Sequence, residues 1–474
     1  MTSRPVHVVR AAPAFRATRG ELVARLADAD RTTALIGGGP GADGRFSVFC
    51  IRPDEEFLVP SGSAPVRPPR GVWGDRGDDA PDVFDRLRDL ATRYRVVGPN
   101  PGLPFAGGVL AVLGFDLRTH VERLPDRHPP DPSCPDLLAR LFSAVLVHDG
   151  QDDVAEVYRL ADLEDENFTA AAADVAAELA IRGGSGMKAL PPTPPPRGRP
   201  TCSDDPDGYR AKVAAVIEHV RAGDVYQLNL AQRFEGPCGL DAVGFMLRLL
   251  ERNPAPFGGL VRLGPGAWLA SASPERFFRV RNGVATTRPI KGTAPRGRDR
   301  EEDERLLASL RGSPKERAEL AMIVDLLRND LSTTCRTGSV VVREAFIPES
   351  HPTVHHLTAT VEGAIRPDRD VFDLVRAAWP GGSISGCPKI RALELIDRLE
   401  SFRRGPYTGS LAAFSADGGA DLNILIRSVL LVGDRAITWG GGGVTADSDP
   451  EAERIETLHK IRGLAAALNW ELPA

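Results

Sequence analysis

The chain has 474 residues, a length that predicts two domains or one large two-lobed unit. Its residues are 42% hydrophobic and 26% charged, a composition typical of soluble globular proteins. A formal net charge of −5 provides no overall basic field, so neither nucleic acid nor an anionic membrane is an expected partner. No apolar run is long enough to span a membrane, no signal-peptide core is evident, and the six cysteines are scattered. These features predict a cytoplasmic protein with reduced thiols.

The N-terminal part of the chain mixes two kinds of hydrophobic pattern. Apolar runs rich in β-branched and aromatic residues predict strands at 45–51 and 107–115. Amphipathic spacing predicts helices at 82–96 and 168–181.

A Gly- and Pro-rich stretch, residues 183–206, contains few large apolar side chains and is typical of an extended connector. We therefore divide the chain into an N-terminal region of residues 1–182, this linker, and a C-terminal domain of residues 207–472.

The C-terminal domain contains more strand patterns than helix patterns. Helices are predicted at 208–223 and 314–331, and strands at 225–234, 267–281, 339–346, 411–416, 422–432 and 436–442. The strands follow one another without steady alternation with helices. This order favours an α+β fold with antiparallel sheets over a doubly wound parallel sheet.

The stretch RPIKGTAPRG, residues 288–297, contains two prolines and two glycines and is predicted to be a turn or loop. Its lysine, Lys291, is either a solvated surface charge or an amine directed at a substrate. Most loop lysines are solvated, so the role of Lys291 depends on the other motifs.

Two carboxylate pairs have helical spacing. Glu316 and Glu319 share one face of the helix predicted at 314–331. Glu453 and Glu456 share a face of a second helix, for which Asp449 is the expected N-cap. Either pair alone is typical of a solvated helix face, but two pairs that converge would suit Mg²⁺, which prefers oxygen ligands.

Glycine-rich turns at 380–389 and 439–449 allow backbone N–H groups to approach an anion closely, although ordinary tight turns have the same composition. Arg427 lies in an otherwise apolar strand pattern, where a buried guanidinium would need an anionic partner. His351 and His355 are four residues apart, but the proline between them argues against a helical metal site.

Eight motifs occur in an order that resembles the chorismate-utilising enzymes: SASPERFF, RPIKGTAPRG, KERAELAMIVDLLRNDLS, VHHLTATVEG, GGSISGCPKIRALELID, RGPYTGSLAAFS, LNILIRS and GGGGVTADSDPEAERIETLHK. The strong resemblance spans residues 208–465. It implies a two-lobed α+β fold with a central antiparallel β-sandwich flanked by helices, chorismate as the substrate and Mg²⁺ as the cofactor.

The resemblance also implies roles for individual residues. Glu319 and Glu456 correspond to direct magnesium ligands, and Glu316 and Glu453 to carboxylates that act through water. Lys291 corresponds to a nucleophile, Glu275 to a general acid/base, and His356 to a histidine beside the reacting ring. The implied substrate-binding residues are Gln227, Thr293, Ser383, Ser385, Lys389, Tyr407, Arg427, Gly441, Gly442, Gly443 and Lys460.

Two positions distinguish branches of this family. Members that add water have a lysine at the position of Gln227, and glutamine cannot act as a base. Anthranilate synthases have alanine at the position of Lys291, whereas aminodeoxychorismate synthases have lysine. The resemblance therefore implies amination of chorismate at ring carbon 4, towards p-aminobenzoate and folate, through a covalent bond to Lys291.

No amidotransferase domain is evident in the chain, so a separate glutamine amidotransferase subunit is the expected source of ammonia. Two alternatives remain open: an anthranilate synthase component I, and a non-catalytic relative that binds chorismate. The retained acidic pairs, Lys291 and Arg427 argue against the second alternative.

Overall fold

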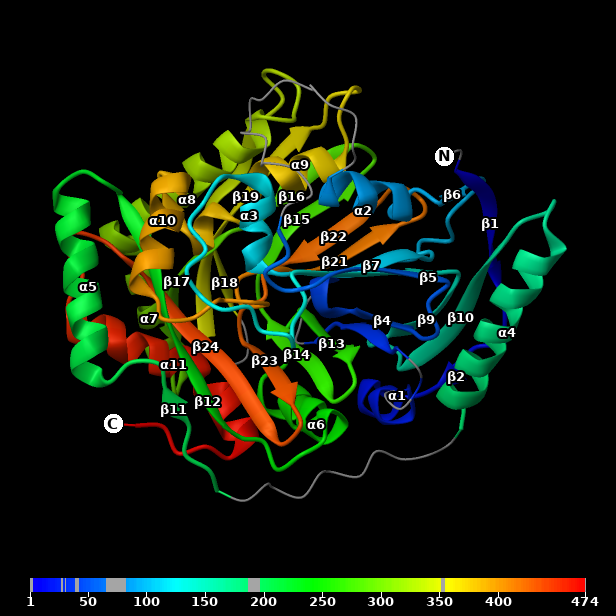
Figure 1. Cartoon of the computed structure of the whole chain (residues 1–474), viewed down its shortest axis with the longest axis horizontal. Coiled ribbons are helices and arrows are strands. Elements are labelled where there is room, and N and C mark those ends of the chain that lie inside the picture. The colour runs from blue at the N-terminus through cyan, green and yellow to red at the C-terminus, as the bar shows by residue number, and fades with distance from the viewer. Residues whose placement is uncertain are drawn as a thin grey trace.

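The structure is a computed structural model, and it describes residues 3–26, 29, 31–38, 42–64, 82–185, 197–350 and 354–473. In this part of the chain two large β-sheets pack face to face, and helices cover their outer faces (Figure 1). Neighbouring strands are antiparallel, except that β1 (Arg4–Arg10) runs parallel to β6 (Tyr94–Val96).

The first sheet contains fourteen strands within the described residues. In spatial order they are β11 (Thr201–Cys202), β12 (Gln227–Pro237), β24 (Arg435–Val444), β23 (Ser428–Val432), β14 (Ala267–Ser273), β13 (Phe257–Gly264), β3 (Thr33–Ile36), β4 (Phe46–Cys50), β9 (Ala144–Asp149), β10 (Val154–Ala161), β1 and β6, with β2 (Phe15–Arg16) beside β10 and β20 (Gly386–Cys387) beside β12.

The second sheet contains ten strands within the same ranges. They are, in order, β17 (Ile290–Pro295), β19 (Val354–Ala364), β16 (Val284–Thr287), β15 (Arg276–Arg281), β22 (Ala420–Asn423), β21 (Ser410–Ser415), β7 (Gly108–Leu113), β8 (Leu137–Phe142) and β5 (Glu55–Val59), with β18 (Val341–Ser350) also beside β19. Strands from before and after the linker share both sheets, since β3 pairs with β13 and β7 with β21.

Helices pack on the outer faces of the sandwich and between its edges. They are α1 (Arg19–Leu26), α2 (Val83–Ala91), α3 (Arg118–Val121), α4 (Glu166–Gly183), α5 (Pro206–Arg221), α6 (Ala242–Arg252), α7 (Arg300–Gly312), α8 (Pro314–Ser332), α9 (Val371–Ala378), α10 (Lys389–Leu399) and α11 (Pro450–Leu468), with 3₁₀ turns η1 (Ala42–Gly44), η2 (Phe115–Leu117) and η3 (Gly382–Ile384). None of the described helices combines the length and the apolar character needed to cross a membrane.

The apolar side chains form layers that follow this architecture. Val112 and Leu138 of the second sheet pack against Leu269 and Ile437 of the first, in the space between the sheets. Helices α1, α4, α6 and α11 cover the outer face of the first sheet, and α2 and α9 cover the second. Burial of this apolar surface is the main favourable contribution to the stability of the fold.

Several predicted boundaries differ from the structure. The stretch predicted as one strand at 267–281 forms two strands, β14 and β15, which Pro274 and Glu275 separate. The helix predicted at 82–96 ends at Ala91, and Tyr94–Val96 form strand β6, where β-prone side chains pair with β1. Within the predicted linker 183–206, Thr201–Cys202 pair with β12 as strand β11, and residues 186–196 lie outside the described residues.

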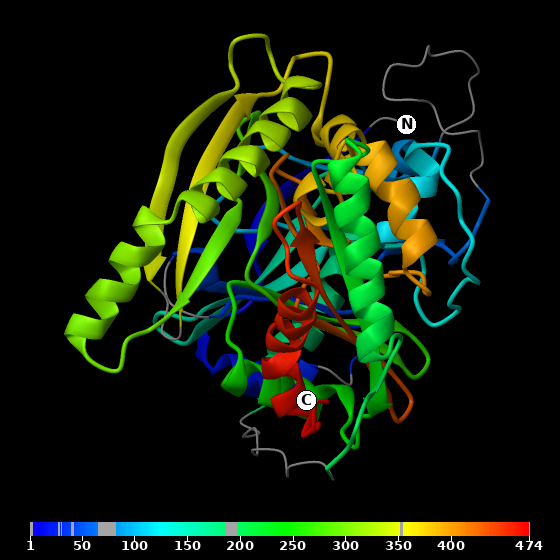
Figure 2. The same ribbon diagram turned by 90° about the vertical axis from the view of Figure 1, so that its left-hand side faces the viewer.

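Helices α7 and α8 and strands β17, β18 and β19 form a part of the molecule that projects from the sandwich (Figure 2, left). It has its own small cluster of buried apolar residues, which includes Leu310, Leu320 and Leu357. This part carries several of the predicted site residues, while β12, β24 and α11 carry most of the others.

Candidate active site

Lys291 lies on strand β17 rather than in a loop, so the prediction of a turn or loop at 288–297 is wrong in its central part. Prolines and glycines are tolerated here because β17 is at the edge of its sheet and pairs only with β19. The pairing shifts register between Lys291 and Thr293, around Gly292, whose φ of +70° suits glycine. This bulge sets the direction of the strand on either side of Gly292.

The ammonium group of Lys291 is half-buried and makes no hydrogen bond or ion pair with the described residues. Burial lowers the pKa of Lys291, and the nearby Lys460 lowers it further. The carboxylates of Glu319, Glu275 and Glu456 oppose this shift without cancelling it. This shift increases the fraction of the neutral amine, the form that a nucleophile requires.

Glu275 lies in the short connection between β14 and β15, where Pro274 ends the first strand. Burial raises the pKa of Glu275 to about 7, although Lys291 and Lys460 act to lower it. The carbonyl of Glu275 accepts a hydrogen bond of 3.0 Å from the backbone N–H of Ile424, which fixes the connection. A carboxyl group with this pKa can both donate and accept a proton near neutral pH.

Glu316 and Glu319 lie in the first turns of α8, as predicted. Ser313 caps this helix by accepting a hydrogen bond of 3.3 Å from the N–H of Glu316. A Cβ at Gly292 would lie only 3.0 Å from Oε2 of Glu316, so the carboxylate packs against the bulge of β17. Burial, followed by the negative charge of Glu319, raises the pKa of Glu316.

Glu453 and Glu456 lie at the start of α11, which Asp449 caps as predicted. Ser448 donates a hydrogen bond of 2.7 Å to Glu453. Burial raises the pKa of Glu453 and acts in the same direction on Glu456. At Glu456 burial is the largest single effect, but Lys460, 2.6 Å away, together with Lys291 and Lys315 outweighs it, so the pKa of that carboxylate is lowered.

The carboxylates of α8 and α11 influence one another electrostatically, since the charge of Glu456 helps to raise the pKa of Glu316. Within the described ranges, no three His, Cys, Asp or Glu side chains are close enough to form a protein-only metal site. The donor set still suits Mg²⁺, which binds carboxylate oxygens and usually completes its coordination shell with substrate and water.

Arg427 lies between β22 and β23 rather than within a strand, which corrects the sequence-based interpretation. Its φ of +51° is unusual for a residue other than glycine, and such conformations are often found at functional sites. The half-buried guanidinium has no hydrogen bond or ion pair with the described residues, and burial alone lowers its pKa. A ligand carboxylate would supply the missing partner.

Tyr407 lies beside the glycines of β24. Its ring stacks on Trp439 with centroids 5.8 Å apart, and a Cβ at Gly441 would lie 2.9 Å from the tyrosine oxygen. Burial raises the pKa of Tyr407 to about 12, against the effect of Arg404, so the hydroxyl stays protonated. It can therefore donate a hydrogen bond at neutral pH.

Gln227 begins strand β12, which pairs with the glycine segment of β24. Its Oε1 atom is buried and has no hydrogen-bond partner in the part of the chain that the structure describes, and a Cβ at Gly443 would collide with Nε2 of the same side chain. At Gly442, a Cβ would lie 2.8 Å from Oε2 of Glu453. Glycine at these positions thus leaves room for polar side chains to approach the strand.

The remaining predicted binding residues have partners within the protein or are described only in part. Lys389 binds the Oδ1 atom of Asp330 at 3.0 Å and the carbonyl of Ala378 at 2.8 Å. Ser385 donates to the carbonyl of Gly381, and Lys460 donates to the carbonyl of Gly441.

Ser383 and His356 are buried. The backbone of His356 pairs with that of Thr293, and the structure describes only the backbone of Thr293. His355, the other histidine of this segment within the described residues, is held by Asp303 and Ser350. His351 lies outside the described residues.

Sequence reasoning missed four polar residues that connect these groups: Asn229, Asp330, Glu400 and Arg404. Asn229 joins β12 to η3, since its side chain donates a hydrogen bond of 3.0 Å to the carbonyl of Ser383. None of these residues has a local pattern that distinguishes it from a surface residue, and only their position next to recognised motifs could have indicated a role.

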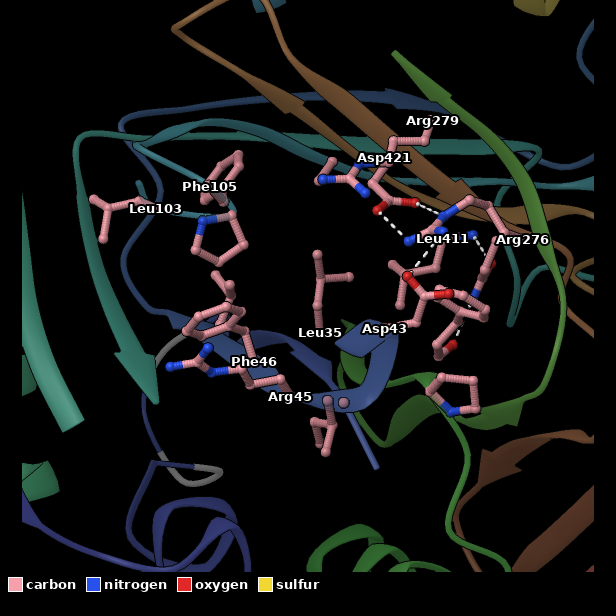
Figure 3. A pocket seen from close by; sticks show the side chains of 18 of the residues that line it. Leu35, Asp43, Arg45, Phe46, Leu103, Phe105, Arg276, Arg279, Leu411 and Asp421 are labelled. Atoms are coloured by element: carbon pink, nitrogen blue, oxygen red, sulfur yellow. Dashed lines mark hydrogen bonds and ion pairs between the residues drawn. The ribbon is translucent and has the colours of Figure 1, made fainter. Parts of the chain in front are cut away.

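A separate cavity of about 580 Å³ lies between the two sheets, and it contains none of the predicted site residues (Figure 3). Leu35, Phe46 and Phe105 contribute apolar walls. Arg276 lies at one end, where it binds Asp421 at 2.9 Å and Asp43 at 3.0 Å. Arg276, Asp421 and Asp43 therefore form a paired charged group at this end of the cavity.

Comparison with known proteins identifies the class to which this chain belongs. It is a member of the chorismate binding enzyme family, which matches residues 48–466, and it is thus an enzyme that acts on chorismate. Over 427 residues it is 40% identical to the aminodeoxychorismate synthase component 1 of Klebsiella aerogenes, with 89% of each chain covered.

Relatives from another branch of the family are also similar. The anthranilate synthase component 1 of Streptomyces coelicolor is 36% identical over 389 residues, which cover 79% of this chain and 75% of that one. The crystal structure of anthranilate synthase component I from Streptococcus pneumoniae superposes with a TM-score of 0.74 at 29% identity and covers 90% of this chain and 93% of that chain. This agreement confirms the predicted α+β fold.

Proposed function

We propose that this chain is the synthase component that forms 4-amino-4-deoxychorismate from chorismate and ammonia, for p-aminobenzoate and folate synthesis. The observation that carries the proposal is Lys291, a half-buried amine that has no partner among the described residues and interacts electrostatically with Glu275 and Glu319. The 40% identity to an aminodeoxychorismate synthase component 1 supports the same branch of the family.

In the proposed reaction, the neutral Nζ atom of Lys291 forms a bond to ring carbon 2 while the bond between carbon 4 and its hydroxyl breaks. Glu275 gives a proton to the departing hydroxyl, which leaves as water. Ammonia then bonds to carbon 4, the bond between carbon 2 and Nζ breaks with its electron pair returning to Nζ, and the proton that ammonia loses returns to the carboxylate of Glu275. The net change is chorismate plus ammonia to aminodeoxychorismate plus water.

Substrate binding is assigned to groups that lack a partner within the described residues. Arg427 would bind a chorismate carboxylate, Tyr407 would donate a hydrogen bond beside it, and the buried Oε1 of Gln227 would accept one. Lys389, Ser385 and Lys460 would need to exchange their present partners to reach the substrate.

Magnesium is the proposed cofactor, with Glu319 and Glu456 as direct ligands and Glu316 and Glu453 as supporting carboxylates. When bound, Mg²⁺ would offset negative charge on the ring carboxylate of the substrate. The raised pKa values of Glu316 and Glu453 are consistent with carboxylates that gain stability from a nearby cation.

We propose that ammonia comes from a separate glutamine amidotransferase subunit and that the complex works in the cytoplasm. The names of the relatives, which are components rather than whole synthases, support a partner. All six cysteines are unpaired, which is consistent with a reducing compartment.

The product formed from chorismate, Mg²⁺ and an ammonium salt tests the proposal. We expect aminodeoxychorismate, identified by mass, and a loss of at least about 10³-fold in its rate of formation in Lys291→Ala. The variant Arg311→Ala is a suitable control, because that exposed cation lies on α7 in the same part of the molecule and is not assigned a role. Anthranilate as the main product would contradict the proposal and favour the other branch of the family.

A further inference from the structure

A buried arginine, Arg404, lies where several substrate-facing segments meet. It follows α10 and precedes the turn that carries Tyr407, and its side chain is only 2% exposed. The guanidinium carbon lies 4.6 Å from the centroid of the Phe115 ring. An arginine this deeply buried is unfavourable unless all its hydrogen-bond donors are satisfied.

All five N–H donors of Arg404 have acceptors. Nε and Nη2 donate to the two carboxylate oxygens of Glu400, at 2.9 and 2.6 Å. Nη1 donates to the carbonyl of Ile384 at 2.9 Å and to the hydroxyl of Thr408 at 3.2 Å. Nη2 also donates to the carbonyl of Asn229 at 2.8 Å. This arrangement uses the full fork geometry that distinguishes arginine from lysine.

Each acceptor lies next to residues assigned to substrate binding. Ile384 stands between Ser383 and Ser385 in η3, and Thr408 directly follows Tyr407. Asn229 lies two residues beyond Gln227 on β12, so the two side chains share a face of the sheet.

Glu400 extends the same network to β24. Its Oε1 atom accepts a hydrogen bond of 2.9 Å from the backbone N–H of Ala231, and Ala231 pairs with Gly441. The Arg404–Glu400 pair therefore connects η3, β12, the Tyr407 turn and, through β12, the glycines of β24.

The backbone at Thr408 gives independent evidence that this connection matters. Its φ of +60° is unfavourable for a β-branched residue, and such a conformation persists only where neighbouring contacts enforce it. The hydrogen bond from Arg404 to the Thr408 hydroxyl and the bond of 2.8 Å from the Thr408 N–H to the carbonyl of Leu425 are contacts of this kind.

We propose that Arg404 and Glu400 are positioning residues for chorismate. They have no role in contacting the substrate, but they fix the relative placement of the serines of η3, Gln227, Tyr407 and the β24 glycines. This inference rests on the proposed chorismate site and is independent of which product the enzyme forms.

The test compares Arg404→Lys and Glu400→Gln with a matched control, Arg248→Lys. Arg248 is also a buried arginine, but its Nε donates to the carbonyl of Ala467 at the far end of α11 from Glu453 and Glu456. The measurements are kcat and KM for chorismate consumption with Mg²⁺ and ammonium, together with Tm, on the full-length variants.

We expect Arg404→Lys to lower kcat/KM by about 10²-fold with a rise in KM, as misplacement of substrate-binding groups by about 1 Å can cause. Glu400→Gln should lose less, because its amide oxygen can still accept one of the hydrogen bonds. Arg248→Lys should lower Tm but keep kcat and KM close to those of the wild type.

Equal kcat/KM values for Arg404→Lys and Arg248→Lys would overturn the inference. If Arg404→Lys does not fold, wild-type kcat and KM in Glu400→Gln would overturn it instead. A wild-type product other than aminodeoxychorismate would overturn the proposed function and leave this inference standing, whereas a wild type that consumes no chorismate would overturn both.

Discussion

The candidate active site and the cavity between the sheets both contain charged side chains, but these side chains differ in whether they have partners within the protein. At the cavity, Arg276 binds Asp421 and Asp43, and Arg281 lies 3.6 Å from Asp417. At the active site, Lys291 and Arg427 have no such partner among the described residues. The ion pairs of Arg276 and Arg281 at the cavity support the fold, whereas Lys291 and Arg427 at the candidate active site are available to a ligand.

This difference has an energetic consequence. Unpaired charged groups lose hydration without a compensating contact, and the pKa shifts of Lys291, Arg427 and Glu275 all reflect that loss. A bound substrate with carboxylates would restore the missing interactions. Unpaired, half-buried charges are therefore better indicators of this site than the size of a cavity.

Removal of divalent cations should have the largest effect on the active site. With a chelator present we expect chorismate consumption to fall by about 10³-fold, since metal assistance contributes several kcal/mol. Added Mg²⁺ should restore the rate in the wild type, but not in Glu319→Gln. Glu304→Gln is the control, because among the described residues that exposed carboxylate binds only Arg300. Full activity in the chelator would contradict the assignment of Glu319 and Glu456.

Arg427→Gln should raise KM for chorismate by about 10²-fold, the effect expected when one partner of a buried charge-assisted contact is lost. Its Tm should stay at the wild-type value, because no described residue loses a partner. Steady-state kinetics and thermal unfolding measure the two quantities. A normal KM, or a large fall in Tm, would mean that Arg427 stabilises the fold instead of binding substrate.

Arg276→Gln should show the opposite behaviour. Because Asp421 and Asp43 would lose their partner, we expect the free energy of unfolding to fall by about 1–3 kcal/mol. Urea unfolding measures this loss. KM for chorismate should change less than in Arg427→Gln, and an equal rise in KM would remove the functional distinction between the two regions.

Glu275 gives the smallest effect, a dependence of stability on pH. Its pKa of about 7 in the folded protein lies above the ordinary value near 4.5, so the unfolded chain releases the proton first as pH rises. Relative to Glu275→Gln, the wild type should lose about 1–2 kcal/mol between pH 4.5 and 7, a value reduced for partial solvation. Urea unfolding at four pH values would detect this loss, and parallel curves would contradict it.

The sequence was sufficient to predict the elements whose patterns are local. The cap at Asp449 and the helices that carry the four glutamates follow from short-range rules. Edge position is not local information, so prolines near Lys291 suggested a loop where the structure has an edge strand. The same limitation applies to Arg427. The sequence pattern predicted one strand at 422–432, whereas the structure has two strands, β22 and β23, with Arg427 between them.

The placement of distant segments could not be predicted from the chain alone. Nothing in the sequence around Arg404 distinguishes a buried arginine with five acceptors from an exposed one. The pairing of β12 with β24 brings Gln227 beside Gly443. This contact depends on the register between the two strands, which neither strand sequence determines alone. The motifs named candidate residues for the site, whereas nothing in them indicated the hydrogen-bond network that supports it.

The sharing of both sheets by early and late strands also constrains biosynthesis. Strand β3 cannot pair with β13 until residue 264 has left the ribosome, and β7 must wait for β21, which ends at residue 415. Until then each sheet presents an open edge, the feature that most readily pairs with other chains. Folding of this enzyme is therefore expected to finish only after most of the polypeptide has been translated. We expect the chain to need a chaperone most while only its N-terminal half has been synthesised.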